Sequence, residues 1–208
     1  MRKIVIDLEW NQPLKGRTHV DGLPGEVIQI GAAVMNDDGT VGERFNQMIK
    51  PHYYSRMNKD ISALTLITDA DIAKGIPLKD AVEKFRSFCG EDFVFLEWGP
   101  EDIRMLERNM IKFGLDTGWL PRAYDAQLMF DDMEMQEDRC WPLNYALFHY
   151  SEKPDGAHDA LADAVSTILI LRHLDLEDGL SDDYFRCDHL PDLYEEDETD
   201  SPEDQGTA

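Results

Sequence analysis

Short apolar runs alternate with amphipathic stretches along the first 175 residues of the chain. Runs of apolar and β-branched residues predict strands at 3–8, 26–35, 43–51 and 92–98. The turn sequence NDDGT lies between the second and third runs and predicts an antiparallel hairpin. Apolar residues at helical spacing predict helices at 77–90, 100–114, 142–150 and 159–174.

Two segments are expected to be mixed. Residues 61–72 are expected to form a short helix and a loop, and residues 122–130 a short strand that leads into a helix. The resulting order is strand, hairpin, helix, strand, helix, strand, helix, helix. It predicts an α/β domain over 1–175 with a mixed sheet and helices on both faces.

The charge of the chain is strongly negative and unevenly distributed. Asp and Glu number 43 against 20 Lys and Arg, and −13 of the net charge of −23 lies after residue 174. This composition predicts a weakly packed appendage at 176–194 and a disordered acidic tail at 195–208. The remaining charge of −10 disfavours tight binding of a long nucleic acid, which normally requires a basic face, but leaves room for a cation-dependent site.

The cysteines and the apolar runs bear on location. Cys89, Cys140 and Cys187 do not have the spacing of metal ligands, which predicts reduced thiols in a cytoplasmic protein. No apolar segment near residue 1 is long enough for a signal peptide. The longest later apolar run, 168–171, is too short to cross a bilayer, so no membrane association is expected.

The stretch KIVIDLEW at 3–10 carries two acids at the end of the first predicted strand. Alternate residues of a strand face the same side, so Asp7 and Glu9 should project together, roughly 6–7 Å apart. Two carboxylates this close raise each other's pKa unless a cation lies between them. The alternative is a strand end whose two acids are solvated.

The stretch HDALAD at 158–163 places a histidine beside the start of a late helix. Asp159 is the expected N-cap, which leaves His158 in the preceding loop and Asp163 near the first helical turn. Histidine is the side chain that best accepts a proton near neutral pH. The alternative is ordinary helix-start chemistry with a solvated histidine.

The stretch LEWGPED at 96–102 repeats the pattern of a strand that ends in an acid-bearing turn. Its candidate ligands are Glu97, Glu101 and Asp102. The alternative is helix capping, which is favoured for Glu101. Carboxylates from two strand ends and a helix can supply the oxygen ligands of two divalent cations, a pair suited to in-line attack on a phosphodiester. No stretch has the ligand pattern of an EF-hand calcium loop.

The ordered set of motifs resembles the DEDDh 3′–5′ exonucleases, which are DnaQ-like. Asp7 and Glu9 match the first motif, Asp102 the second, and His158 and Asp163 the third, within a resemblance over about 3–175. The pair Trp98–Gly99 resembles the branch of histone-mRNA 3′-end exoribonucleases and KapD-like proteins. The resemblance implies an RNase H-like fold, a five-stranded mixed sheet flanked by helices.

The resemblance also implies a cofactor and a role for each motif residue. Asp7, Glu9 and Asp163 would hold one Mg²⁺ or Mn²⁺, Asp7 and Asp102 the second, and His158 would be the general base. The implied reaction is hydrolysis of single-stranded nucleic acid, RNA favoured over DNA, from a free 3′-OH end with release of 5′-mononucleotides. The alternative is a catalytically weak protein of the same fold that acts through protein contacts.

Other residues are candidates for substrate contacts. Trp10, Leu64, Thr65 and Trp98 could contact a terminal base, since aromatic side chains stack on bases. Core packing is favoured for Leu64 and is the alternative for Trp98.

The loop after the first strand carries a second group of candidates. Lys15, Arg17 and His19 could meet substrate phosphates, with a solvated loop as the alternative. Two positions depart from the family pattern: Leu66 stands where glycine is common, and Trp10 where a smaller residue is common. Both bear on the width of the pocket for the terminal nucleotide.

Overall fold

The computed structural model describes residues 1–121, 123–136, 139–153, 159–174, 176 and 180–185. Its strands are β1 (Arg2–Asn11), β2 (Glu26–Met35), β3 (Val41–Met48), β4 (Phe93–Glu97) and β5 (Ala123–Asp125). They form one sheet in the order β3-β2-β1-β4-β5. The β1–β2 and β2–β3 pairs are antiparallel, and the β1–β4 and β4–β5 pairs are parallel. The predicted hairpin and mixed sheet are therefore confirmed.

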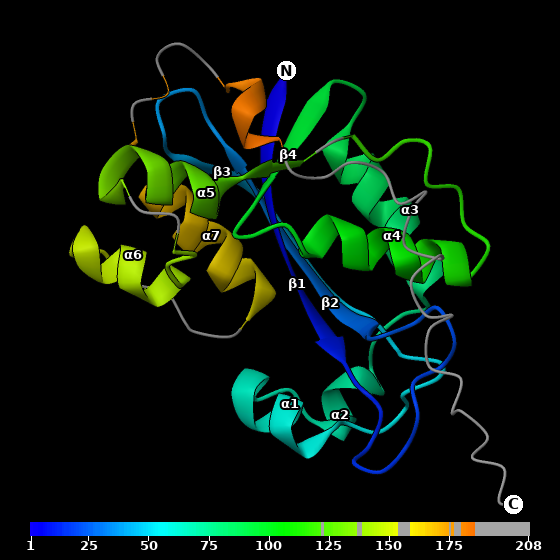
Figure 1. Ribbon diagram of the computed structural model, residues 1–208. Helices are drawn as coiled ribbons and strands as arrows, with labels where there is room; N and C mark the ends of the chain where they lie inside the picture. The colour runs from blue at the N-terminus through cyan, green and yellow to red at the C-terminus, as the bar shows by residue number, and fades with distance from the viewer. Residues whose placement is uncertain (122, 137–138, 154–158, 175, 177–179, 186–208) are drawn as a thin grey trace, which may run out of the picture.

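Helices cover both faces of this sheet (Figure 1). They are α1 (Lys59–Thr65), α2 (Asp69–Ile72), α3 (Leu78–Cys89), α4 (Asp102–Lys112), α5 (Ala126–Phe130), α6 (Leu143–His149) and α7 (Ala160–Leu171). A π-helical turn, η1 (Asp131–Met135), continues α5, and a 3₁₀ turn, η2 (Asp182–Tyr184), follows later. Every predicted helix is present, with ends a few residues shorter, and the predicted strand at 43–51 ends at Met48.

The alternation of side chains along β1 divides the core into two layers. Ile4, Ile6 and Leu8 pack with α3 and α4, whereas Val5 packs on the other face with α5 and α7. Asp7 and Glu9 continue the Val5 side, because alternate residues share a face. The two acids therefore point towards α7 and not into the α3–α4 layer.

Gly31 on β2 permits an unusually close approach of α7. Gly31 pairs with Asp7 on β1. A Cβ added at Gly31 would lie 2.1 Å from the carbonyl carbon of Ala160 and from the amide nitrogen of Leu161. Only glycine leaves room for this contact, so the first turn of α7 lies directly against the strand next to Asp7.

The described residues near 180–185 contact the edge of the sheet. Phe185 forms an isolated bridge with Tyr124, and the centroids of their rings are 4.3 Å apart. The Tyr184 hydroxyl donates a hydrogen bond to Asp132 at 2.9 Å. Composition predicted only weak packing for 176–194, and residues 195–208 lie outside the described part. Among the described helices, none is long and apolar enough to span a bilayer.

Candidate metal centre

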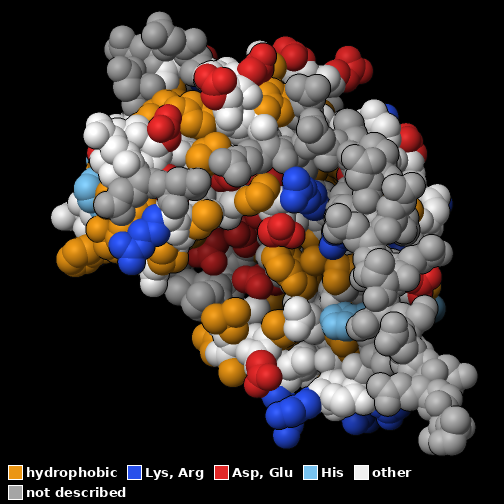
Figure 2. Space-filling model, viewed as in Figure 1, with side chains coloured by type: hydrophobic (Ala, Val, Ile, Leu, Met, Phe, Trp, Pro, Cys, Tyr) orange, Lys and Arg blue, Asp and Glu red, His pale blue; other side chains and the backbone are white. Residues whose placement is uncertain are grey.

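Three carboxylates from two distant parts of the chain meet at the carboxyl-terminal half of β1. Oxygens of Asp7, Glu9 and Asp163 all lie within 4.8 Å of one another. Asp7 and Glu9 come from alternate positions of β1, and Asp163 comes from the first turn of α7. Figure 2 shows acidic side chains recessed in a hollow on this face of the molecule. The prediction that the first two acids project together is confirmed.

Asp102, the first residue of α4, is fixed beside this group. Its Oδ1 accepts a hydrogen bond from the backbone amide of Leu8 at 3.0 Å, and its side chain is buried. Because Leu8 lies between Asp7 and Glu9, this bond holds the Asp102 carboxylate against the strand that carries both acids. The parallel pairing of β1 with β4 brings α4 to this edge.

Glu101 occupies the N-cap position of α4, whereas Glu97 supplies the side-chain hydrogen bond to the start of this helix. The buried Glu97 carboxylate accepts a hydrogen bond from the amide of Ile103 at 2.9 Å. The side chain of Glu101 makes no capping bond and lies 4.0 Å from Arg104. The favoured interpretation of Glu101 is confirmed for its position, which is the N-cap of α4, but the side-chain bond to the helix amides comes from Glu97.

Burial and mutual repulsion disfavour the charged forms of these acids. Burial, followed by the charges of Asp102, Asp163 and Glu9, raises the pKa of Asp7 well above its usual value. Burial, followed by the charges of Asp163 and Asp159, raises the pKa of Glu9 to about 7. Burial raises the pKa of Asp102 to about 8, although the Leu8 amide opposes this. A divalent cation among them would reverse the effect.

Gln29 fixes the start of α7. Asp159 caps this helix as predicted, since its Oδ1 accepts a hydrogen bond from the amide of Ala162 at 3.2 Å. Its Oδ2 accepts a second bond from Gln29 Nε2 at 2.8 Å, and the same nitrogen donates to Asn46 Oδ1 at 3.0 Å. Sequence reasoning missed Gln29, although a lone amide inside the apolar run 26–35 was a signal. His158 lies outside the described residues, so its role stays a prediction.

Asn11 ties β1 to the segment that precedes α1. Its Nδ2 donates to the carbonyl oxygens of Tyr54 and Arg56, each at 2.8 Å, and its Oδ1 accepts from the amide of Asn58 at 2.9 Å. Asn58 in turn caps α1. The strand with the acid pair and the helix beside it are therefore held together by one buried amide, which the sequence pattern did not reveal.

The end of α1 lines a hollow next to the acids. Thr65 and Leu66 border a cavity of about 540 Å³ together with Gln29 and Asp159. Thr65 is buried and its hydroxyl donates to the carbonyl of Ile61 at 3.0 Å. Leu64 is 52% exposed, so its expected packing in the core is wrong. Leu66 is 75% exposed and has a φ of 60°, the left-handed conformation in which glycine is favoured.

The two candidate tryptophans are half-buried in packing contacts. Trp10 packs on the α3–α4 face, opposite to Asp7 and Glu9, with its ring against Gly25. Trp98 Nε1 donates to the carbonyl of Trp141 at 3.2 Å, and its ring centroid is 5.9 Å from that of Phe130. The described contacts of both rings are thus with the core and not with the carboxylates.

Comparison with known proteins gives consistent matches. The sequence model of a family described as exonuclease matches residues 4–171. A probable 3′-5′ exonuclease, KapD of Bacillus subtilis (strain 168), is 24% identical over 171 residues, which are 81% of this chain and 82% of that protein.

Solved structures share the fold. The nuclease domain of 3′hExo, described as a DEDDh family member bound to rAMP, superposes with a TM-score of 0.74 at 16% identity, covering 90% of this chain and 96% of that one. A 3′-exonuclease that recognises a histone mRNA stem-loop superposes with a TM-score of 0.74 at 16% identity. The match covers 89% of this chain and 84% of that one. The expected RNase H-like fold and the resemblance to the DEDDh and KapD-like branch are confirmed.

Proposed function

Since the chain belongs to the exonuclease family, we propose that it is a 3′–5′ exonuclease of the DEDDh type that uses two divalent cations. The observation that carries this proposal is the meeting of Asp7, Glu9 and Asp163 within 4.8 Å. Asp102 supports it, because the Leu8 amide holds its carboxylate next to the same strand. The family match supports nuclease activity, and the cluster supports the mechanism.

The donor set fits Mg²⁺ or Mn²⁺. These ions prefer carboxylate oxygens. Burial and then neighbouring carboxylates raise the pKa values of Asp7 and Glu9, and burial raises the pKa of Asp102, a cost that a bound cation would offset. We assign Asp7, Glu9 and Asp163 to one ion, and Asp7 and Asp102 to the other. Two such ions, when bound, lower the pKa of the attacking water and stabilise charge on the leaving oxygen.

The chain's own residues provide position and proton transfer. The Gln29–Asp159 bond fixes the start of α7, and with it Asp163; His158 directly precedes Asp159 in the sequence. We assign His158 the role of general base, because an imidazole takes a proton near neutral pH. Glu97 accepts a hydrogen bond from the start of α4 and so orients Asp102 towards β1.

The substrate we propose is single-stranded nucleic acid with a free 3′-OH, RNA in preference to DNA, with 5′-mononucleotides as products. The acids are recessed in a hollow, which supports attack on the end of a strand. The RNA preference is supported by two solved neighbours with TM-scores of 0.74, which are described with rAMP and with an mRNA stem-loop. Neighbours with TM-scores of 0.59 and 0.62 are described with duplex DNA and with a dT13 oligonucleotide. Trp10, Leu64, Thr65 and Trp98 remain proposed contacts; of these, Leu64 and Thr65 lie at or beside the hollow.

The test uses 5′-labelled single strands of RNA and DNA with one sequence, each with a free or a phosphate-blocked 3′ end. We expect stepwise shortening from the free 3′ end in Mg²⁺ or Mn²⁺, none after chelation, and faster loss of RNA. Asp163→Asn is the inactive control. Full activity after exhaustive chelation, or cleavage inside a blocked strand, would contradict the proposal. Binding without cleavage would favour the catalytically weak alternative.

A further inference from the structure

Five basic side chains gather beyond the carboxyl end of β1 without acidic partners. Elsewhere in the described part of the chain, seven bases lie within 4.0 Å of a carboxylate, namely Arg2, Lys3, Lys74, Lys79, Arg86, Arg104 and Arg172. Four exposed bases have no such ion pair among the described residues, but they are scattered over the chain at Arg44, Lys84, Arg139 and Lys153. The bases of segments 11–25 and 50–60 have no such ion pair within the described residues, namely Lys15, Arg17, Lys50, Arg56 and Lys59. All five are exposed.

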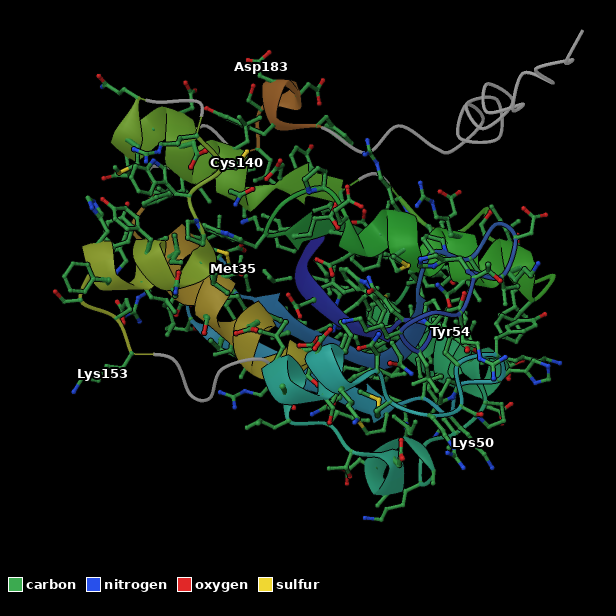
Figure 3. All side chains as sticks on the ribbon, turned by 60° about the horizontal axis from the view of Figure 1, so that its bottom comes forward. Met35, Lys50, Tyr54, Cys140, Lys153 and Asp183 are labelled. Atoms are coloured by element: carbon green, nitrogen blue, oxygen red, sulfur yellow. The ribbon has the colours of Figure 1, made fainter. Side chains whose placement is uncertain are left out.

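The same two segments contain few acids. Their own carboxylates are Asp21 and Asp60, and the carboxylates of Glu26 and Asp69 accept hydrogen bonds from backbone amides of residues 52–57. The five bases still outnumber these four acids, although residues 1–174 carry a net charge of −10. Figure 2 shows Lys and Arg side chains along the lower edge of the molecule, below the acidic hollow. In Figure 3, Lys50 and Tyr54 lie at this end, whereas Lys153 lies on the far side.

A concave surface lies between the two segments. Its volume is about 320 Å³, and its lining includes Arg17, Arg56 and Tyr53, the last with 40% of its surface exposed. A positive groove with an exposed aromatic ring is the composition that binds single strands without sequence preference, because it offers charge to phosphates and a face to bases. We call this surface, which Arg17 and Arg56 line, the basic groove.

The basic groove is joined directly to the strand that carries the acids. Asn11 lies two residues after Glu9, which is about 6–7 Å along a strand. The Asn11 amide donates to the carbonyl oxygens of Tyr54 and Arg56 at 2.8 Å each. The groove wall is thus fixed relative to the metal centre by a buried hydrogen-bonded link.

We infer that the basic groove binds the phosphates of the substrate strand upstream of the nucleotide being removed. This inference rests on the proposed function and names where the rest of that substrate lies. An acidic enzyme repels a polyanion, so a local positive path is needed to hold the strand while its end occupies the acid cluster. Arg17 and Arg56 line the groove itself and are the two contacts we assign first.

The test compares two charge-matched double variants. Arg17→Gln with Arg56→Gln removes two positive charges from the groove, and Lys79→Gln with Lys84→Gln removes two from α3, on the opposite face of the sheet. Each is assayed on a single strand of about a dozen nucleotides and on a dinucleotide, which has no phosphate upstream of the scissile one. The ratio kcat/KM is measured at several salt concentrations. Binding of the longer strand is measured by fluorescence anisotropy with Ca²⁺ in place of Mg²⁺.

The salt dependence gives the decisive readout. Each phosphate contact to a single strand contributes about 0.7 to the slope of log affinity against log salt, so two contacts contribute about 1.4. Between about 50 and 200 mM salt, the native protein should therefore lose about 7-fold more affinity for the longer strand than the groove variant. The dinucleotide should be hydrolysed equally by both, and the α3 variant should behave as the native protein.

Two outcomes separate this inference from the proposed function. An unchanged salt slope and unchanged kcat/KM of the groove variant on the longer strand would overturn the inference, even if hydrolysis is normal. Failure of the native protein to hydrolyse either substrate would remove the proposed function. The anisotropy slopes would then still decide whether the groove binds phosphates.

Discussion

The acid cluster should make the metal-free protein less stable as pH rises, and Glu9→Gln should relieve part of this cost. Burial, then Asp163 and Asp159, raises the pKa of Glu9 from 4.5 to about 7. Between these values the native state holds a proton that the unfolded chain has lost, so the free energy of unfolding falls as pH increases. Above pH 7 the loss is complete, and 2.5 pKa units correspond to about 3 kcal/mol.

Thermal unfolding in EDTA at about pH 5.5 and pH 8 measures this effect. At pH 8, Glu9→Gln should unfold about 6–12 °C above the native protein, at roughly 2–4 °C per kcal/mol for a chain of this size. This difference in unfolding temperature should fall to less than half at pH 5.5, where the Glu9 carboxyl of the native protein is mostly protonated. Mg²⁺ should stabilise the native protein at pH 8 far more than the variant, because the cation replaces the missing positive charge.

An exposed acid provides the control. Glu83→Gln removes a carboxylate from the outer face of α3, where Glu83 is 4.0 Å from Lys79, and should change stability by less than about 0.5 kcal/mol at either pH. If Glu9→Gln destabilises the metal-free protein equally at both pH values, then burial and repulsion do not act on this carboxyl as argued.

Four further substitutions test other parts of the site. Gly31→Ala should destabilise by about 3 kcal/mol and weaken Mg²⁺ binding in calorimetry, because the new Cβ meets the backbone of α7 at 2.1 Å and displaces Asp163; unchanged unfolding would contradict this. Leu66→Gly should stabilise by up to about 1 kcal/mol in denaturant unfolding, because the left-handed φ of 60° is strained for leucine; a loss would show that the exposed side chain packs. His158→Ala should keep metal binding and lose about 10²–10⁴-fold in single-turnover rate, whereas Asp7→Ala should lose the metals; a native rate in the former would remove the general-base assignment.

Sequence patterns within a single strand or helix were enough to predict the positions of some site residues. The two-residue repeat of a strand predicted that Asp7 and Glu9 share a face, and the capping preference of Asp predicted the start of α7 at Asp159. Both are confirmed. Local rules did not separate Asp102 from Glu97 and Glu101; only the family resemblance selected it, and the structure places its carboxylate against β1 through the Leu8 amide.

Contacts between distant segments were beyond such rules. Gln29 contacts Asp159 across 130 residues of sequence, and Asn11 contacts Arg56 across 45 residues. Neither contact can be predicted from the periodicity of apolar residues within one element. Leu64 was expected in the core because leucine usually is. It is exposed because α1 is short and lies at the end of the sheet, where few apolar surfaces remain to cover it.

The position of α7 late in the chain affects when the cluster can form during synthesis. Asp7 and Glu9 emerge first from a ribosome, and Asp102 follows much later. Asp163 reaches them only when the first turn of α7 docks against Gly31 on β2. A nascent chain is surrounded by messenger, transfer and ribosomal RNA. The order of these segments keeps the three-carboxylate cluster incomplete until residue 163 has been added, so a partly made chain carries the acids of β1 without the ligand that completes their site.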